Sequence, residues 1–370
     1  MITLSLPNLM PENLAHSRLF RKPILEISPY SAPLEERTGD YILLDFNERT
    51  TPPHPIVLEE LKRFISEGNL QQYPEYEDVN EIVADYTGIK PEELIITVGS
   101  DQGIDIVTRA LVGEGDKVVI PTPTFAMLEQ SALLQGANII SPSYKGDAYE
   151  FPFDEVMEEL KPGVKLVVIC KPNNPTGTAV TREQSERIIE KAAENGTGVL
   201  ADEAYHEYSP NLTVIDLLDK YPNLFITRTF SKTMGIPSLR AGVVISQKEN
   251  IEELKKIRGP YDVAMPTVAA LKSLRHSEVR EDIKTYTDMV MNTSKPMIEK
   301  FYRDHGVKFA PSAANFHLLE EPGLYDFLKE KRQILVRPRS NPLNTVRVSI
   351  GVREDTEKYL EAYREYLRQK

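Results

Sequence analysis

The sequence has a single cysteine, Cys170, among 370 residues, and it has no long run of apolar residues. One cysteine excludes an intrachain disulfide framework and a metal site built from several thiolates, and it fits a reducing cytoplasm. The first residues lack a basic region followed by an apolar stretch, and no later segment approaches the length needed to cross a membrane. We therefore expect a soluble cytoplasmic protein without a metal site.

Three further absences narrow the function. Basic residues form no cluster along the chain, whose net charge is −12, and this argues against nucleic acid as the main partner. No Gly-x-Gly-x-x-Gly motif follows an apolar run, so a nicotinamide dehydrogenase is not favoured. No helix-turn-helix pattern precedes residue 40, which argues against the sensor half of a transcription regulator.

Apolar segments of strand length alternate with helical segments between residues 94 and 245, and this pattern predicts an α/β fold. Uniformly apolar strands of this kind form a mainly parallel sheet covered on both faces. Residues 241–245 follow the preceding strand too closely for a helical crossover, so we expect them to run antiparallel. After residue 263, long helices and short strands predict a smaller α+β domain. We expect an arm with part of the small domain at 1–44, a large domain at 45–262 and a small domain at 263–370.

Polar clusters follow four of the predicted strands, at the point where each strand ends. Open α/β sheets bind ligands beyond the carboxyl ends of their strands, so these clusters are expected to meet at one site. Turn residues also collect at strand ends, and a single cluster would mean little. The clusters are Ser100-Asp101-Gln102, Asn173-Asn174, Asp202 with Tyr205, and Ser231-Lys232.

The segment from Thr229 to Arg240 surrounds one lysine, Lys232, with hydroxyl groups and an arginine. Hydroxyls and an arginine suit a phosphate, and a lysine beside them suits a Schiff base to an aldehyde. Pyridoxal 5′-phosphate carries both groups. We expect Lys232 to hold this cofactor and to move the substrate proton, and Thr229, Ser231 and Arg240 to bind its phosphate. A solvated surface turn has a similar composition.

A pyridoxal phosphate site needs further parts, and the other clusters supply them. Asp202 is the expected acid beside the pyridine nitrogen, since a carboxylate at the mouth of a buried strand needs a partner. Tyr205 and Asn174 are expected to donate to the phenolate oxygen, although an Asn-Pro turn explains Asn174 equally simply. The backbone N–H groups of Ser100, Asp101 and Gln102 are expected to bind the cofactor phosphate, although a plain helix cap has the same sequence. Phe125 is expected to stack on the cofactor ring, with a place in the hydrophobic core as the alternative. Arg347 is expected to bind a substrate carboxylate, with a solvated position on its strand as the alternative.

These motifs together resemble the class I/II, fold-type-I aminotransferases, in that family's order and spacing from about residue 28 onward. They are Asn173-Asn174-Pro175-Thr176-Gly177, Asp202-Glu203-Ala204-Tyr205, Ser231-Lys232 with Arg240, and Arg347 before Val348-Ser349-Ile350-Gly351. The resemblance implies a large domain with a mainly parallel seven-stranded sheet. It also implies a homodimer with its active site at the subunit interface, where Tyr73 reaches the neighbouring subunit's cofactor phosphate.

Within this family the chain resembles the histidinol-phosphate aminotransferases. The matching segments are Ile27-Ser28-Pro29-Tyr30, Gln72-Tyr73-Pro74, Ala314-Asn315-Phe316 and Ile334-Leu335-Val336-Arg337. The resemblance implies that Tyr30, Asn47 and Arg337 contact the substrate, with Arg337 on its phosphate; Arg339 adds a further cation. The chain departs from the family at Asn47-Glu48-Arg49, where Asn-Glu-Asn is usual, and this puts the substrate in doubt.

The resemblance implies a transaminase that moves an amino group from a donor, best matched by histidinol phosphate, to 2-oxoglutarate. Aromatic or other amino acids are alternative donors. A related lyase or decarboxylase, such as threonine-phosphate decarboxylase, is a second alternative because it shares most of these motifs. A product formed without a keto acid would distinguish that class.

Overall fold

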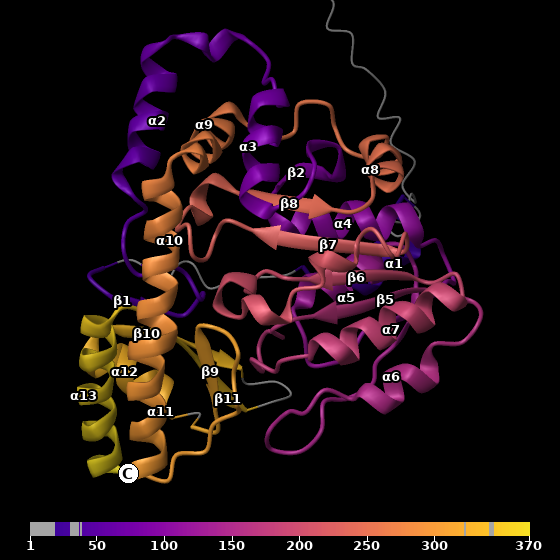
Figure 1. Ribbon diagram of the computed structural model, residues 1–370. Coiled ribbons are helices and arrows are strands. Elements are labelled where there is room, and N and C mark those ends of the chain that lie inside the picture. Colours follow the sequence, from indigo (N-terminus) through magenta and orange to yellow (C-terminus); the bar gives the residue numbers. More distant parts are fainter. Residues whose placement is uncertain (1–18, 30–36, 38, 322, 340–343) are drawn as a thin grey trace, which may run out of the picture.

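The computed structural model describes residues 19–29, 37, 39–321, 323–339 and 344–370. Two β-sheets with separate hydrophobic cores organise this part of the chain (Figure 1). The larger sheet has seven strands in the order β2-β8-β7-β6-β5-β3-β4. Its strands are β2 (Leu94–Val98), β3 (Lys117–Val119), β4 (Asn138–Ile140), β5 (Val164–Cys170), β6 (Gly198–Asp202), β7 (Leu224–Thr229) and β8 (Ala241–Ile245).

Strand β8 alone in this sheet runs against its neighbours, pairing antiparallel with both β2 and β7. The remaining pairs, β3 with β4, β3 with β5, β5 with β6, and β6 with β7, are parallel. The predicted mainly parallel sheet and its antiparallel strand are thus confirmed. The reason is the short connection after β7, which cannot hold the helix that a parallel crossover needs.

Helices cover both faces of the large sheet because its strands are apolar on both sides. One face packs against α4 (Gly99–Leu111), α5 (Ala126–Leu134) and α8 (Lys248–Lys255). The other packs against α2 (Pro55–Ser66), α3 (Glu77–Thr87), α6 (Phe153–Glu159), α7 (Arg182–Glu194) and α9 (Met265–Lys272). Helix α7 begins with a capping box, in which Thr181 and Gln184 bond each other's backbone N–H. A short helix, α1 (Lys22–Glu26), lies against α5.

The smaller sheet joins the start of the chain to its end. Its order is β1-β10-β11-β9, from β1 (Ile42–Leu44), β9 (Phe316–Leu319), β10 (Ile334–Arg339) and β11 (Thr345–Ser349). Strand β1 pairs parallel with β10, so the segment before the large sheet belongs to the small one. Helices α11 (Lys295–Asp304), α12 (Leu324–Arg332) and α13 (Arg353–Gln369) pack on this sheet. The division of the chain into domains at residues 44 and 262 stays a prediction.

A long helical segment runs from the large sheet to the small one (Figure 1). The sequence predicts one helix from residue 279 to about 304, and the structure has α10 (Ser277–Met289) and α11 joined by a π-helical segment, Val290–Ser294. Pro296 explains the change of hydrogen-bonding pattern, because its nitrogen has no hydrogen to donate to the preceding turn. This π-helical segment lies where the long helix passes from the core of the large sheet to that of the small sheet.

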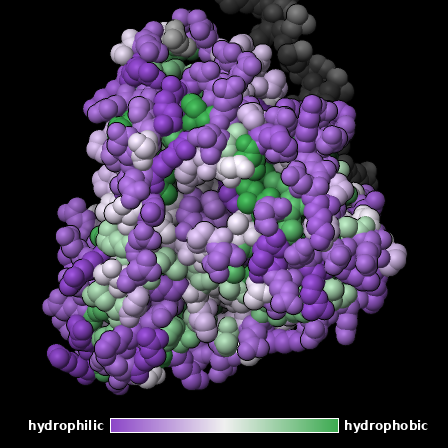
Figure 2. Space-filling model, viewed as in Figure 1, coloured by the Kyte–Doolittle hydropathy of each residue, from purple (hydrophilic) through white to green (hydrophobic). Residues whose placement is uncertain are grey.

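No helix within the described ranges is long and apolar enough to span a bilayer. The face of the molecule in Figure 2 is hollowed near its centre, where hydrophilic residues are visible.

Candidate active site

A cavity of about 650 Å³ lies beyond the carboxyl ends of β2, β5, β6 and β7, with the small sheet as its far wall. All four predicted polar clusters reach it. Of the residues predicted from the sequence, fourteen line this cavity: Asn47, Ser100, Asp101, Phe125, Asn174, Asp202, Tyr205, Thr229, Ser231, Lys232, Arg240, Arg337, Arg339 and Arg347. The last three line it from the small sheet.

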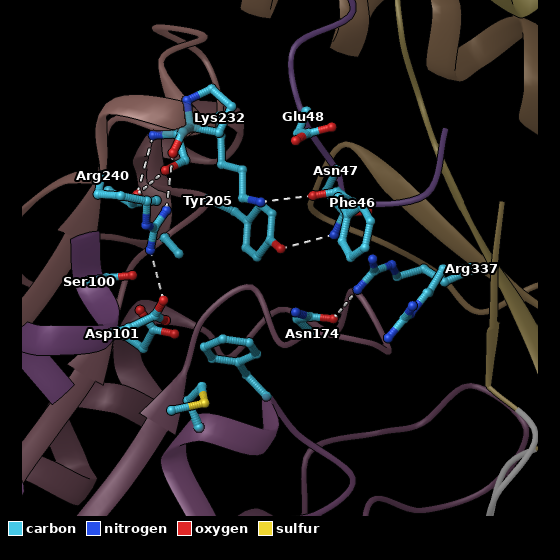
Figure 3. Close-up of a pocket in the computed structure, with 18 of the residues that line it drawn as sticks. Phe46, Asn47, Glu48, Ser100, Asp101, Asn174, Tyr205, Lys232, Arg240 and Arg337 are labelled. Carbon is cyan, nitrogen blue, oxygen red and sulfur yellow. Dashed lines mark hydrogen bonds and ion pairs between the residues drawn. The ribbon is translucent and has the colours of Figure 1, made fainter. Parts of the chain in front are cut away.

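Lys232 follows the end of β7 and points into the cavity (Figure 3). Its Nζ donates a hydrogen bond of 2.9 Å to the backbone oxygen of Phe46. Burial, together with the positive charge of Arg347, lowers the pKa of Lys232 to about 8. An amine with this pKa is in part neutral near physiological pH, and the neutral form is the nucleophile that attacks an aldehyde.

Asp202 is the last residue of β6 and only 3% exposed. Its carboxylate accepts a hydrogen bond of 3.0 Å from Thr227 Oγ1, and Cys170 Sγ lies 3.6 Å from Oδ2. Burial raises the pKa of Asp202 to about 6, because a lone carboxylate loses its hydration there. A cationic ring nitrogen is the kind of partner that would offset this cost, so the site fits a pyridinium.

Hydroxyls, an arginine and a helix N-terminus lie together where a phosphate group would be held. Thr229 and Ser231 lie within hydrogen-bonding distance of each other, at 3.0 Å between their hydroxyl oxygens. Arg240 Nη2 lies 2.8 Å from Oδ2 of Asp101, in the first turn of α4 (Figure 3). The backbone N–H groups at the start of α4 and the dipole of that helix favour an anion. This combination fits a phosphate.

Gly242 allows β8 to lie close to the start of α4, and this contact shapes the phosphate cup, formed by Thr229, Ser231, Arg240 and the N-terminus of α4. A Cβ atom at Gly242 would lie 2.3 Å from the backbone carbon of Gly99, at the start of α4. No side chain fits at that distance, so only glycine lets β8 pack against the helix N-terminus. No local pattern in the sequence indicates this role, because it depends on two segments about 140 residues apart.

Asn174 and Tyr205 occupy the wall between the lysine and the small sheet. Asn174 Oδ1 accepts a hydrogen bond of 2.6 Å from Arg347 Nη1, which turns the amide nitrogen towards the cavity (Figure 3). Asn47 Nδ2 donates to the Tyr205 hydroxyl at 2.9 Å. Burial raises the pKa of Tyr205 to about 12, so the phenol keeps its proton at neutral pH and can donate it in a hydrogen bond.

Arginines concentrate on one face of the small sheet. Arg337 and Arg347 are directly paired across β10 and β11, and Arg339 lies two residues further along β10. Because side chains alternate along a strand, all three point to the same side, and all three line the cavity. Arg347, 4% exposed, also donates to the backbone oxygen of Asp45 at 2.6 Å. Val346 and Val348 alternate with it and pack in the small core.

Two predicted residues do not line the cavity, and a third is not described. The Gln102 side chain accepts from Val98 N at 2.8 Å and donates to Asp262, so only its backbone N–H remains suited to phosphate. Tyr73 is 77% exposed and stacks on Tyr261 with 4.4 Å between ring centroids, outside this cavity. Tyr30 falls outside the described residues.

The cavity also contains residues that the sequence analysis gave no role. Arg37 forms ion pairs with Glu48 and Asp45, and its guanidinium lies 4.8 Å from the ring centre of Phe46. Arg337 lies 5.2 Å from the centre of the same ring. A carboxylate following a short apolar strand is a local signal for Glu48, whereas nothing near Arg37 in the sequence indicates that it meets the site.

The comparisons with known proteins agree with this geometry. The family model described as "Aminotransferase class I and II" matches residues 39–362. The chain belongs to the class I and II aminotransferases. A histidinol-phosphate aminotransferase 2 of Archaeoglobus fulgidus is 32% identical over 352 residues, which cover 92% of this chain and 98% of that protein. A histidinol-phosphate aminotransferase of Caldanaerobacter subterraneus is 33% identical over 307 residues, covering 81% and 85%.

Solved structures show the same fold. A histidinol-phosphate aminotransferase from Sinorhizobium meliloti, in complex with pyridoxal 5′-phosphate, superposes with a TM-score of 0.81 at 24% identity, over 95% of this chain and 98% of that one. An aspartate aminotransferase from Thermotoga maritima gives 0.79 at 23% identity, over 94% and 100%. The fold is that of fold-type-I pyridoxal phosphate enzymes, and the predicted large and small sheets are confirmed.

The cofactor of this aminotransferase is pyridoxal 5′-phosphate. The cofactor supplies an electron sink that stabilises negative charge at the substrate's α-carbon. The residues of this chain fit that group at each end: hydroxyls, Arg240 and a helix N-terminus for the phosphate, and the buried carboxylate of Asp202 for the ring nitrogen. Lys232 lies between these ends with its amine partly neutral.

Proposed function

We propose that this aminotransferase takes histidinol phosphate as its amino donor and 2-oxoglutarate as its acceptor, as a step of histidine biosynthesis in the cytoplasm. The observation that carries the proposal is the set of three arginines on one face of the small sheet, Arg337, Arg339 and Arg347. A site with several cations facing one cavity favours substrates that carry strong anionic groups, and phosphate and dicarboxylate both qualify.

In this proposal Arg347 binds the α-carboxylate of the keto acid, and Arg337 binds the phosphate of the donor. Arg337 has no carboxylate within ion-pairing distance among the residues that the structure describes, while Phe46 supports its guanidinium from one side. An arginine held against an aromatic ring keeps its hydrogen-bond donors directed outward. Arg347 instead has its position fixed by Asn174 and by the Asp45 carbonyl.

Lys232 moves the proton at the donor's α-carbon in this proposal, because its side chain lines the cavity and its pKa is lowered to about 8. Asp202 keeps the ring nitrogen protonated, and Tyr205 and Asn174 donate to the phenolate oxygen. Ser100, Asp101, Gln102, Thr229, Ser231 and Arg240 bind the phosphate group through side chains or backbone, and Phe125 stacks on the ring. Tyr30 and Asn47 contact the substrate in this scheme, and Tyr73 reaches the cofactor phosphate of the second subunit of a homodimer.

The test mixes the cofactor-loaded protein separately with histidinol phosphate, an aromatic amino acid and glutamate, and follows the absorbance of the bound cofactor. Conversion by micromolar histidinol phosphate, and a keto-acid requirement for turnover, are expected. Conversion only by aromatic amino acids or glutamate would replace the donor and keep the transamination. No conversion by any donor, with product formed from O-phosphothreonine without a keto acid, would replace transamination by decarboxylation.

Lys232→Ala is the decisive variant for the assignment of the lysine. It is expected to bind the cofactor without the absorbance of the covalently attached form and to lose turnover. Turnover at the wild-type rate would contradict the assignment. Size-exclusion chromatography with light scattering tests the homodimer separately, and a monomer with full activity would remove Tyr73 from the site.

A further inference from the structure

Arg49 lies one residue beyond the cavity wall, in the segment where this chain departs from the usual pattern of its family. Its side chain is only 5% exposed. The guanidinium holds both carboxylate oxygens of Asp282 on α10, at 2.7 and 3.0 Å. It also lies 4.6 Å from the ring centre of Tyr286, one turn further along that helix. A bidentate pair of this kind fixes both the position and the orientation of the guanidinium.

The same guanidinium contacts the loop that carries the lysine. Arg49 Nη1 donates a hydrogen bond of 3.1 Å to the backbone oxygen of Thr233, the residue directly after Lys232. Two residues further on, Gly235 has φ of +73°, and a Cβ there would lie 2.9 Å from Cδ of Arg49. The loop therefore packs on the aliphatic stem of Arg49 and bonds to its charged end.

The side chain of Lys232 contacts the chain segment that contains Arg49. Lys232 Nζ donates to the backbone oxygen of Phe46, three residues before Arg49. Residues 46–49 thus hold both the amine of Lys232 and the main chain that follows it. Arg49 Nε donates to Thr51 Oγ1 at 2.9 Å, and Tyr286 accepts from the backbone N–H of Thr50 at 3.1 Å, so this segment is itself fixed to α10.

We propose that Arg49 is a positioning residue, which sets the place of the Lys232 amine by holding the Thr233 carbonyl against Asp282 and α10. The proposal rests on the assignment of Lys232 made above. The action is geometric, because Arg49 contacts the backbone oxygen of the residue after Lys232, while the amine of Lys232 bonds to the backbone oxygen of Phe46. The fork of a guanidinium is what reaches the carboxylate and the carbonyl together, and an ammonium cannot reproduce it.

The test compares two variants in the cofactor-loaded protein. Arg49→Lys keeps the charge and loses the fork, so it weakens the contact to Thr233. Asp282→Asn removes the ion pair and leaves Arg49 able to donate to both the amide oxygen and Thr233. For each variant, the absorbance of the bound cofactor is titrated with pH, and the rate at which the apo protein takes up the cofactor and the melting temperature are measured.

Arg49→Lys is expected to move the absorbance titration by about 0.5 pH unit or more and to slow cofactor uptake, while Asp282→Asn, which keeps one acceptor oxygen for Arg49, lowers the melting temperature and moves the titration by less. An unchanged titration in Arg49→Lys would overturn the proposal. Equal shifts in both variants would also overturn it, since the effect would then pass through the ion pair alone.

Two controls separate this result from other causes. Arg182→Lys alters an arginine that pairs with Asp216 and Glu186 far from the lysine loop, and it is expected to leave the titration unchanged. If Lys232→Ala showed the same pH-dependent absorbance as the wild type, the assignment of the lysine would fail, whatever the Arg49 variants do. If Arg49→Lys does not fold, Arg49→Gln, which keeps a planar donor group, takes its place under the same criteria.

Discussion

Arg347 Nη1 donates a hydrogen bond of 2.6 Å to Oδ1 of Asn174, so a residue expected to bind substrate touches a residue expected to bind the cofactor. Arg347 belongs to the small sheet, and Asn174 follows β5 of the large one. The bond therefore joins the two sheets at the cavity. A substrate carboxylate that binds Arg347 would compete with Asn174 for the same guanidinium, which links substrate binding to the orientation of the Asn174 amide.

Arg347→Lys is expected to raise mainly the KM for the keto acid, and Arg337→Lys mainly the KM for the phosphorylated donor. Loss of the planar fork at Arg347 should raise KM for the keto acid by roughly 10- to 100-fold, because one or two charge-assisted hydrogen bonds are lost. Loss of the fork at Arg337 should raise KM for the phosphorylated donor and leave that for the keto acid near its wild-type value. Steady-state kinetics with both substrates varied distinguishes the two, and equal effects of both variants on both substrates would contradict the separate roles.

The rate of cofactor uptake by the apo protein should rise with pH through a midpoint near 8 and level off at higher pH. The neutral amine of Lys232 is the reactive form, and burial lowers its pKa to about 8, so its fraction grows as pH rises through that value. Arg347 lowers the same pKa, so Arg347→Met should move the inflection upward. Stopped-flow absorbance between pH 6.5 and 10 measures both curves; an inflection near 10.5 in the wild type would mean that the amine is hydrated.

Lys171→Met is expected to stabilise the apo protein at neutral pH. Lys171 is 1% exposed, its Nζ contacts Ser185 Oγ at 2.5 Å, and burial lowers its pKa to about 8 from 10.5. The folded-state pKa lies below the unfolded one, so the cost of the buried charge, about 3 kcal/mol, is fully present below pH 8 and disappears as pH rises towards 10.5. The variant's advantage should therefore be largest at pH 7 and shrink by pH 9.5.

Urea unfolding of both proteins at the two pH values measures that difference. Lys191→Met on α7 is the matched control, since Lys191 is exposed and pairs only loosely with Glu194 at 3.4 Å. A variant less stable than the wild type at pH 7 would mean that the contact with Ser185 outweighs the cost of burying the charge.

Gly242→Ala is expected to damage the phosphate cup more than the rest of the fold. The added Cβ meets the backbone of Gly99 at 2.3 Å, so β8 must move away from the start of α4, at a cost of roughly 1–3 kcal/mol. We expect at least about tenfold weaker cofactor binding by equilibrium titration, since the N–H groups of α4 and Arg240 lose their common geometry. Gly113→Ala, whose Cβ would lie 3.5 Å from its nearest neighbour, is the control and should bind normally.

The meeting of the strand-end clusters at one cavity was predictable because its signals are local. Each strand-end cluster combines an apolar run with polar residues directly after it, and the topology of a parallel sheet then brings the ends together. Asp202, Lys232 and Asn174 meet in the structure for this reason. The antiparallel direction of β8 followed from connection length alone.

Contacts between distant segments were not predictable in the same way. Arg49 and Asp282 are 233 residues apart, and neither has a neighbour in the sequence that indicates the pairing. Helix α12 has no clear signal in the sequence, because only Leu324 and Leu328 are buried along it. Two apolar residues four positions apart are also common in loops, so this spacing does not distinguish a helix. Packing of this segment against α13 and β10 stabilises its helical conformation.

The reversed strand β8 has a consequence for how this enzyme can change. Because β7 and β8 are neighbours, the eleven residues between Thr229 and Ala241 are pinned at both ends by the same ladder of hydrogen bonds. A residue inserted there would displace Lys232 or Arg240, whereas the longer crossovers elsewhere can absorb extra length in their loops. We therefore expect insertions to be tolerated in the loops around residues 230–240 and not within that segment.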